Sequence, residues 1–486
     1  MAGSIKKNAF YNVLLNISQV IFPLITAPYV SRVLEPDGVG LFNFANTYAG
    51  YFALVALLGI PTYGVREVAK ARDDKESLSM LVSQLMTIAV MTTVVVSAVY
   101  LITIAVVGQL TENYIIFLLA GFVIYLAPFK INWYYQGLEE FGFITMRSLI
   151  LRTLGIICLF VFVRTKSDLV IYIIISVLTG ILADIWNFTR MWMSGVRPRL
   201  TSKGLRQHIK PLLILFASSV AISIYTVLDT IMLGFIKDYE EVGYYSNAMH
   251  MSRILVTAVA SLSLVAVPRV SYYMKNKDYD NINRFMNKSL SVVAFLAFPT
   301  AIGLSCIAPT FIPLFFGDKY MGAIIPLMIL SMLIIVIGFN NLTGMQILIG
   351  MGLDKLFLYS VLTGTVSNFL MNCILIPMYG ANGASVASVS AELLILIVMA
   401  YFVYRHTPIR LDRWVDILKA FAGTVLFFPL LILLEKVLDG WYLVGGFVLS
   451  GALVYVLIEA LLRNEALSLL FAAISEKLKR TKQDSL

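Results

Sequence analysis

Long apolar stretches recur along almost the whole chain, and they constrain its fold more than any other feature. The hydrocarbon core of a bilayer is about 30 Å thick, so an α-helix needs roughly 20 apolar residues to cross it. The chain contains about fourteen such stretches, separated by short polar joints. Hydrophobic residues make up 59% of the sequence and charged residues 13%, whereas soluble domains have roughly a half and a quarter. These features exclude a water-soluble fold.

The expected spans are continuous runs rich in Leu, Ile, Val and Ala, whereas the strands of a membrane barrel alternate over about 10 residues. The sequence therefore predicts an all-α integral membrane protein. We place its spans at 8–31, 40–64, 79–108, 113–130, 143–163, 168–193, 210–236, 243–267, 289–316, 322–350, 356–378, 381–404, 415–435 and 441–462.

The cysteines and the N-terminus add little to this picture. All three cysteines, Cys158, Cys306 and Cys373, fall inside apolar stretches, so we interpret them as small core residues and expect neither a metal site nor a cofactor. Lys6 and Lys7 precede a first stretch that is too long for a signal peptide and lacks a small-residue cleavage site. We expect this stretch to remain as a span.

The net charge of +9 comes from basic residues that gather in alternate loops. One set comprises Lys6, Lys7, Arg66, Lys70, Arg72, Lys75, Arg197, Arg199, Lys203, Arg206, Lys210, Arg269, Lys275, Lys277, Arg284, Lys288, Arg405, Arg410, Arg413, Lys477, Lys479, Arg480 and Lys482. The opposite loops carry only Arg32, Arg164, Lys166, Lys237, Lys319 and Lys436. By the positive-inside rule, both termini are expected in the cytoplasm of a bacterial cell, with the chain in the inner membrane. The charge thus predicts topology and no nucleic-acid partner.

The two halves of the chain resemble each other. Sliding the sequence along itself aligns Val39-Gly40 with Val242-Gly243 and Arg66 with Arg269. Parallel halves of this kind suit alternating access, in which two bundles rock around a central site. The expected domains are an N-terminal lobe (1–196), a cytoplasmic linker (197–209), a second lobe (210–405) and two further helices with a basic tail (406–486). Arg66 and Arg269 would hold equivalent places, as interfacial anchors or as parts of a cytoplasmic gate.

Charged residues inside spans are costly and therefore mark candidate functional sites. Counting about 1.5 Å per residue from the expected helix ends places Arg152, Arg253 and Glu392 near mid-membrane. Arg147 and Arg190 lie nearer the cytoplasmic ends, where a long side chain can extend to the interface, so they rank below the first two arginines.

Two buried acids complete this set, Asp184 and Asp229. Asp229 and Arg253 begin at similar depth in neighbouring spans, so an ion pair between them is an alternative to a functional role for either.

Polar side chains at helical spacing form one face on each of three expected spans. The faces comprise Asn8, Asn12, Asn16, Gln19 and Thr26 in the first span, Ser219, Ser223, Thr226 and Thr230 in the seventh, and Thr365, Asn368 and Asn372 in the eleventh. Asn16, Gln19, Asn368 and Asn372 are candidates for lining a wet cavity. Hydrogen bonds between helices are the alternative, since small polar residues provide them in any bundle.

Several motifs resemble those of one transporter family. The run Ala27-Pro-Tyr-Val-Ser-Arg-Val-Leu34, followed by Gly38-Val-Gly40 and Gly59-Ile-Pro-Thr-Tyr-Gly-Val-Arg-Glu67, resembles the opening of the Wzx-type polysaccharide repeat-unit flippases. These belong to the multidrug/oligosaccharidyl-lipid/polysaccharide exporter superfamily. The segments 133–139 and 228–234 resemble further parts of the same family, and the resemblance covers residues 5–405.

The resemblance implies two lobes around a cavity and passage of undecaprenyl-diphosphate-linked oligosaccharides to the periplasmic leaflet, for O-antigen, capsule or exopolysaccharide synthesis. Arginines would hold the diphosphate by charge-assisted hydrogen bonds. Asp229, Glu392 and Asp184 would be candidate carriers of coupled H⁺ or Na⁺. A polysaccharide polymerase and a chain-length protein are candidate partners.

Other functions remain open at this point. A multidrug or toxin extruder and a peptidoglycan-precursor flippase belong to the same superfamily, but a cationic drug would favour buried acids over arginines. A membrane polymerase or ligase would need catalytic groups in a water-exposed site, and the predicted outer loops are short. The sequence contains no Gly-Lys dipeptide, which excludes a Walker A loop in this chain. We therefore expect a transporter and not an enzyme.

Overall fold

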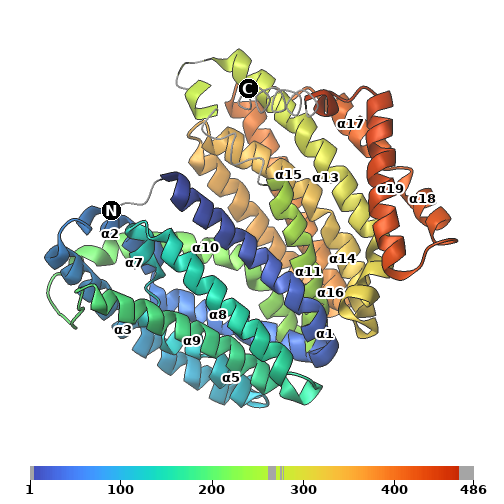
Figure 1. The fold of residues 1–486 in the computed structure, drawn as a ribbon. Coiled ribbons are helices and arrows are strands. Elements are labelled where there is room, and N and C mark those ends of the chain that lie inside the picture. Colours follow the sequence, from blue (N-terminus) through green and yellow to red (C-terminus); the bar gives the residue numbers. More distant parts are fainter. Residues whose placement is uncertain (1–4, 261–269, 274–275, 277, 470–486) are drawn as a thin grey trace, which may run out of the picture. The chain divides into compact units, whose positions relative to one another are not determined.

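The computed structural model describes residues 5–260, 270–273, 276 and 278–469, and these residues form helices and connecting turns without a strand (Figure 1). The predicted all-α membrane fold is confirmed. The chain divides into two compact units, unit 1 (Met1–Gly243) and unit 2 (Tyr244–Leu486). The seventh expected span belongs to unit 1 by its contacts, although the sequence placed it in the second lobe, so the lobe boundaries stay a prediction.

Unit 1 is built mainly from long helices that pack on α1. Its elements are α1 (Ile5–Leu57), α2 (Ile60–Ala71), α3 (Lys75–Val106), α4 (Gly108–Thr111), α5 (Tyr114–Ala120), α6 (Phe122–Tyr125), η1 (Ala127–Phe129), α7 (Asn132–Gly137), α8 (Phe141–Phe162), η2 (Lys166–Asp168), α9 (Leu169–Met193), α10 (Arg206–Ile236) and the first turn of α11 (Tyr239–Ala260). Helix α1 contacts α3, α8 and α10, and α8 runs beside α9 (Figure 1).

Unit 2 contains the rest of α11 and a group of helices around α13. Its further elements are α13 (Tyr279–Phe316), η4 (Asp318–Ala323), α14 (Ile324–Ser331), α15 (Leu333–Asn340), η5 (Asn341–Ile349), α16 (Asp354–His406), α17 (Trp414–Gly423), α18 (Phe427–Leu434) and α19 (Gly440–Leu461). Segment η5 is a π-helix. Helix α13 contacts α14, α15, α17 and α19.

Nine helices in the described ranges are long and apolar enough to cross a membrane, or ten if the bent pair Tyr114–Tyr125 and Ala127–Gly137 is one span. Two of the nine are pairs of helices joined at a break, one at Glu35 and one at Gly380. Counting each of these two pairs as two spans gives eleven spans in the described ranges, or twelve with the bent pair. Helices α10 and α11 occupy the places of the seventh and eighth expected spans.

The break in α1 follows from local chemistry. Glu35 has a φ of 62° and precedes Pro36, whose ring disfavours a right-handed helical conformation in the residue before it. The chain therefore turns here between the first two expected spans. Lys166 stabilises the turn, because its Nζ lies 3.2 Å from Glu35 Oε2 and 3.8 Å from Asp37 Oδ2.

Two of the expected boundaries were wrong. The second span ends at Leu57, because Gly59 adopts a φ of 78° and α2 begins as a separate helix. The expected continuous span 113–130 is instead a series of short helical pieces that ends beyond Lys130. Tight turns at Gly121 and at Ala127–Phe129 interrupt it.

The glycines that the internal repeat aligns lie against each other. A Cβ on Gly40 would lie 1.6 Å from the carbonyl oxygen of Tyr239, and one on Gly243 would lie 2.1 Å from that of Pro36. Any side chain would therefore force the second half of α1 and the start of α11 apart. The absence of a Cβ at both positions permits this close backbone crossing.

Candidate functional site

A polar cavity in unit 1 brings together two residues that the sequence singled out. It has a volume of about 400 Å³ and lies among the first half of α1, α8 and α9. Gln19 and Thr26 reach it from α1, Arg152 from α8 and Thr179 from α9. The Arg152 guanidinium carbon lies 6.0 Å from the ring centroid of Phe22, which also lines the cavity. This arrangement presents one cation and several hydroxyl and amide groups in a lining that also contains apolar side chains.

A second, smaller cavity shares the lining residue Ser176 with the first. Its volume is about 200 Å³, and its polar lining includes Asn46, Lys130 and Asp184. Sequence reasoning missed Lys130 because it stands at the edge of an expected span, where a lysine is ordinary. The only indication of a role for Lys130 in the sequence was that its charge is opposite to that of Asp184.

Arg147 contradicts its sequence interpretation. It was expected to extend to the interface, but its side chain is 4% exposed. Both terminal nitrogens donate to Asn132 Oδ1 at 3.2 Å, and Nη1 also donates to Asn187 Oδ1 and, at 3.4 Å, to the carbonyl of Ala183. Asn132 precedes α8, so the sequence gave no sign that it would lie within reach.

Asp184 interacts electrostatically with both Arg147 and Lys130. Asn187 also donates from Nδ2 to Asn132 Oδ1 at 3.0 Å, which ties the two asparagines together beside the arginine. The result is a polar cluster in which the buried side chains of Arg147 and Asn187 bond to the exposed Asn132, with Asp184 at its side. Its hydrogen bonds are mostly made within the protein, which favours a structural role for Arg147 over substrate binding.

Arg190 lies at the surface, as expected. Its Nη2 is 2.7 Å from Glu140 Oε2, and both side chains are more than a third exposed. Its guanidinium also lies 4.0 Å from the ring centroid of Phe143. The arrangement is that of an interfacial anchor.

Arg66 is likewise a surface residue, with its side chain 56% exposed and its Nε 3.0 Å from Glu67 Oε1. Partial burial acts to raise the pKa of Glu67, but hydrogen bonds from Lys70 and Arg66, with their charges, outweigh it and leave the pKa below its usual value. Arg269, the repeat equivalent of Arg66, lies outside the described residues.

Glu392 in unit 2 has a partner that sequence reasoning missed. Asn340 donates from Nδ2 to Glu392 Oε2 at 2.6 Å and to the backbone carbonyl of Glu392 at 3.1 Å. Asn340 is the last residue of α15 and immediately precedes the π-helix η5. Because π-helices are rare and often occur at functional sites, this junction is a reasonable place for an acid that exchanges ions.

The remaining candidates lie apart from these groups. Asn372 donates from Nδ2 to Asn368 Oδ1 at 3.1 Å, and both are buried. Asn16 is exposed on α1. Asp229 is buried and interacts electrostatically with Tyr51 in unit 1, whereas Arg253 is exposed on α11 in unit 2. The ion pair between Asp229 and Arg253 stays a prediction.

Comparison with known proteins gives these features a context. A sequence model described as polysaccharide biosynthesis protein matches residues 5–274. A protein of Escherichia coli (strain K12) that is named as an O-antigen transporter is 24% identical to this chain over 410 residues. The alignment covers 82% of this chain and 97% of that protein.

Solved structures share the fold. The lipid II flippase MurJ in an inward closed conformation superposes with a TM-score of 0.73 at 14% identity, covering 93% of this chain and 98% of that one. An inward-facing multidrug resistance MATE family transporter of the MOP superfamily gives a TM-score of 0.62 at 14% identity, covering 82% and 98%. The predicted resemblance to the polysaccharide flippases of this superfamily is confirmed.

Proposed function

The chain belongs to the polysaccharide biosynthesis protein family, and from this premise we propose that it flips lipid-linked oligosaccharides across the inner membrane. The cargo is an oligosaccharide repeat unit on undecaprenyl diphosphate, and it moves from the cytoplasmic to the periplasmic leaflet for assembly into surface polysaccharide. The names of relatives support a flippase or transporter rather than an enzyme.

The observation that carries this proposal is the unit 1 cavity with Arg152. A diphosphate is anionic, and a guanidinium can hold it by paired, charge-assisted hydrogen bonds. The neighbouring hydroxyl and amide groups of Gln19, Thr26 and Thr179 can exchange hydrogen bonds with sugars. Arg152 is the only charged residue among the described residues that line the cavity, which favours an anionic cargo over a cationic drug.

Ion coupling by H⁺ or Na⁺ is the finer part of the proposal. Asp184 lines a cavity that shares Ser176 with the Arg152 cavity. A change in the charge of Asp184 would therefore change the electrostatic potential close to the cargo. Glu392 with Asn340, and Asp229, are the further candidates. In an alternating-access cycle, ion binding at such acids would bias the equilibrium between inward-open and outward-open states.

Substitutions at Arg152 test the proposal in cells. In a strain that lacks the native gene, Arg152→Ala should abolish surface polysaccharide and leave lipid-linked units on the cytoplasmic face, because a charge crossing the bilayer would lose its counter-charge. Arg152→Lys should retain partial export, since lysine keeps the charge but not the planar fork.

The matched control is Thr153→Ala, which changes the adjacent, exposed residue of α8 and should export normally. Surface polysaccharide is quantified by immunoblot at equal membrane levels of each variant. Normal export by Arg152→Ala would refute the assignment of the diphosphate to this cavity.

A further inference from the structure

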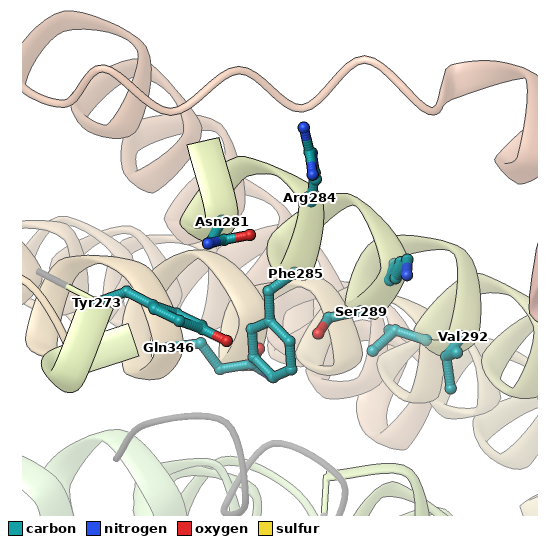
Figure 2. A pocket seen from close by; sticks show the side chains of 9 residues that line it. Tyr273, Asn281, Arg284, Phe285, Ser289, Val292 and Gln346 are labelled. Atoms are coloured by element: carbon teal, nitrogen blue, oxygen red, sulfur yellow. The ribbon is translucent and has the colours of Figure 1, made fainter. Parts of the chain in front are cut away.

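A third cavity, in unit 2, belongs to none of the groups described above. Its volume is about 520 Å³, within the range of ligand pockets, which is roughly 300–1,000 Å³. Helix α13 forms one wall with Asn281, Arg284, Lys288 and Ser289, and Gln346 of the π-helix η5 contributes from a neighbouring element. Figure 2 shows Tyr273 and Phe285 gathered beside Gln346, with Arg284 at the upper rim in that view.

The cationic residues lie on one helical face. Arg284 and Lys288 are separated by one turn of α13, and both are exposed. No acid is found among the described residues that line the cavity. An anion entering it would therefore meet two positive charges.

A neighbouring cavity of about 510 Å³ shares Arg284 and Lys288 but has a different charge balance. Its lining also includes Asp412, Asp416 and Glu465. Two of these acids are paired, since Arg413 Nη1 lies 2.8 Å from Glu465 Oε2 and Lys419 Nζ lies 3.5 Å from Asp416 Oδ1. The carboxylates would repel an anion there, so the cavity with Gln346 is the better anion site.

Besides its two cations, the cavity offers a ligand a hydrogen-bond acceptor, the side-chain carbonyl of Gln346. Its side chain is 1% exposed, and its Oε1 is buried without a hydrogen-bond partner in the structure. A buried amide carbonyl without a donor is destabilising, and it accepts hydrogen bonds only. At neutral pH a phosphate group is ionised and does not donate a hydrogen bond to this carbonyl, whereas a sugar hydroxyl does.

The position of the cavity along the membrane normal suits a lipid head group. Helix α13 has 38 residues and is therefore about 57 Å long at 1.5 Å per residue, well beyond the ~30 Å hydrocarbon core. Arg284 and Lys288 lie in its first three turns, ahead of the apolar stretch that begins at Leu290. They are thus placed at the membrane interface, on the side predicted to face the cytoplasm.

We propose that this cavity binds the glycosyl-phosphate head of the lipid-linked oligosaccharide at the cytoplasmic interface, an inference that rests on the proposed function. Arg284 and Lys288 hold a phosphate, and Gln346 accepts a hydrogen bond from a hydroxyl of the first sugar. The site therefore binds both the phosphate and the first sugar of the cargo before the cargo reaches the membrane interior.

Binding to the purified full-length protein in detergent tests the proposal with three probes. They are undecaprenyl diphosphate bearing one N-acetylhexosamine, bare undecaprenyl diphosphate, and phosphatidylglycerol. The double variant Arg284→Gln with Lys288→Gln should bind both diphosphate lipids about tenfold or more weakly, since tenfold corresponds to about 1.4 kcal/mol. Gln346→Met, which keeps the length of the side chain, should weaken only the sugar-bearing lipid.

The control variant is Arg405→Gln, which removes an exposed charge in the last turn of α16 and should bind all three lipids like the native protein. Thermal melts of every variant show whether it is folded, and the double variant changes only exposed positions. Equal binding by the double variant and Arg405→Gln would overturn the proposal. So would equal, Arg284-dependent affinity for phosphatidylglycerol, because the cavity would then be a site for resident lipid.

The outcome separates this proposal from the proposed function. If the native protein binds the sugar-bearing lipid and the double variant binds it equally well, only the unit 2 site is wrong. If the native protein binds neither diphosphate lipid, the proposed function itself fails, and this inference falls with it.

Discussion

Three arginines in unit 1 occupy different environments, and we therefore expect them to have different roles. Arg147 is enclosed by Asn132, Asn187 and the carbonyl of Ala183, so most of its donors are satisfied by the protein. Arg190 pairs with Glu140 at the surface. Arg152 faces a polar cavity and lies against the ring of Phe22. Of the three, Arg152 keeps its hydrogen-bonding fork closest to a space that a ligand can fill.

This division predicts different losses of stability. Arg147→Gln should lower the free energy of unfolding by about 1–3 kcal/mol, because the buried amide group of Asn187 loses its charged partner. Arg190→Gln should cost about 0–1 kcal/mol, as is usual for an exposed ion pair. Thermal unfolding of the purified variants in detergent measures both. An Arg147 variant as stable as the Arg190 variant would contradict the structural role.

The sequence located these residues only in part. Composition and helical spacing singled out Gln19 and Arg152 separately, and only the fold shows that both line one cavity. They misjudged Arg147, because its burial depends on Asn132 from a separate short helix, α7. They missed Lys130 because it stands at the edge of an expected span, where a lysine is ordinary. They missed Asn340 because it is a single amide inside the expected span 322–350, and only the fold shows that Glu392 lies opposite.

At the scale of elements, apolar run length predicted the helices well and their interruptions poorly. The turn at Glu35 could be expected from Pro36, and it separates α1 into two helices between the first two expected spans. The 3₁₀ turn η1 contains Pro128, whereas the apolar run that forms the π-helix η5 gave no sign of a change in helix type. Hydropathy therefore gave the right fold class with several wrong boundaries.

The close crossing at Gly40 and Gly243 makes a prediction about packing. Gly40→Ala should reduce the amount of folded protein, because its Cβ would lie 1.6 Å from the carbonyl oxygen of Tyr239 and the helices would have to separate, at about 1–3 kcal/mol or more. Gly50→Ala, on the same helix with nothing within 4 Å of the added Cβ, should have no such effect.

Fluorescence size-exclusion chromatography of membranes that express each variant gives the comparison. A monodisperse Gly40→Ala protein at native levels would show that the two helices are not in close contact in the membrane. A loss with Gly50→Ala as well would point to a general intolerance of α1 rather than to the crossing.

At the scale of the whole molecule, the charge distribution predicts an orientation. Reporter fusions at residue 200 should report the cytoplasm, because that loop carries Arg197, Arg199 and Lys203. Fusions at 110 and 319 should report the periplasm. Paired alkaline phosphatase and fluorescent protein fusions measure this, and a periplasmic signal at 200 would invert the proposed direction of transport.

The measurement that most directly tests the account is flipping in proteoliposomes. The purified chain is reconstituted with a fluorescent oligosaccharide on undecaprenyl diphosphate, and a membrane-impermeant quencher reports which leaflet holds the label. We expect the native protein to redistribute the label much faster than protein-free liposomes, and the Arg152→Ala protein to remain near the protein-free rate. Redistribution by the native protein no faster than in protein-free liposomes, with the protein shown to be folded, would contradict the account.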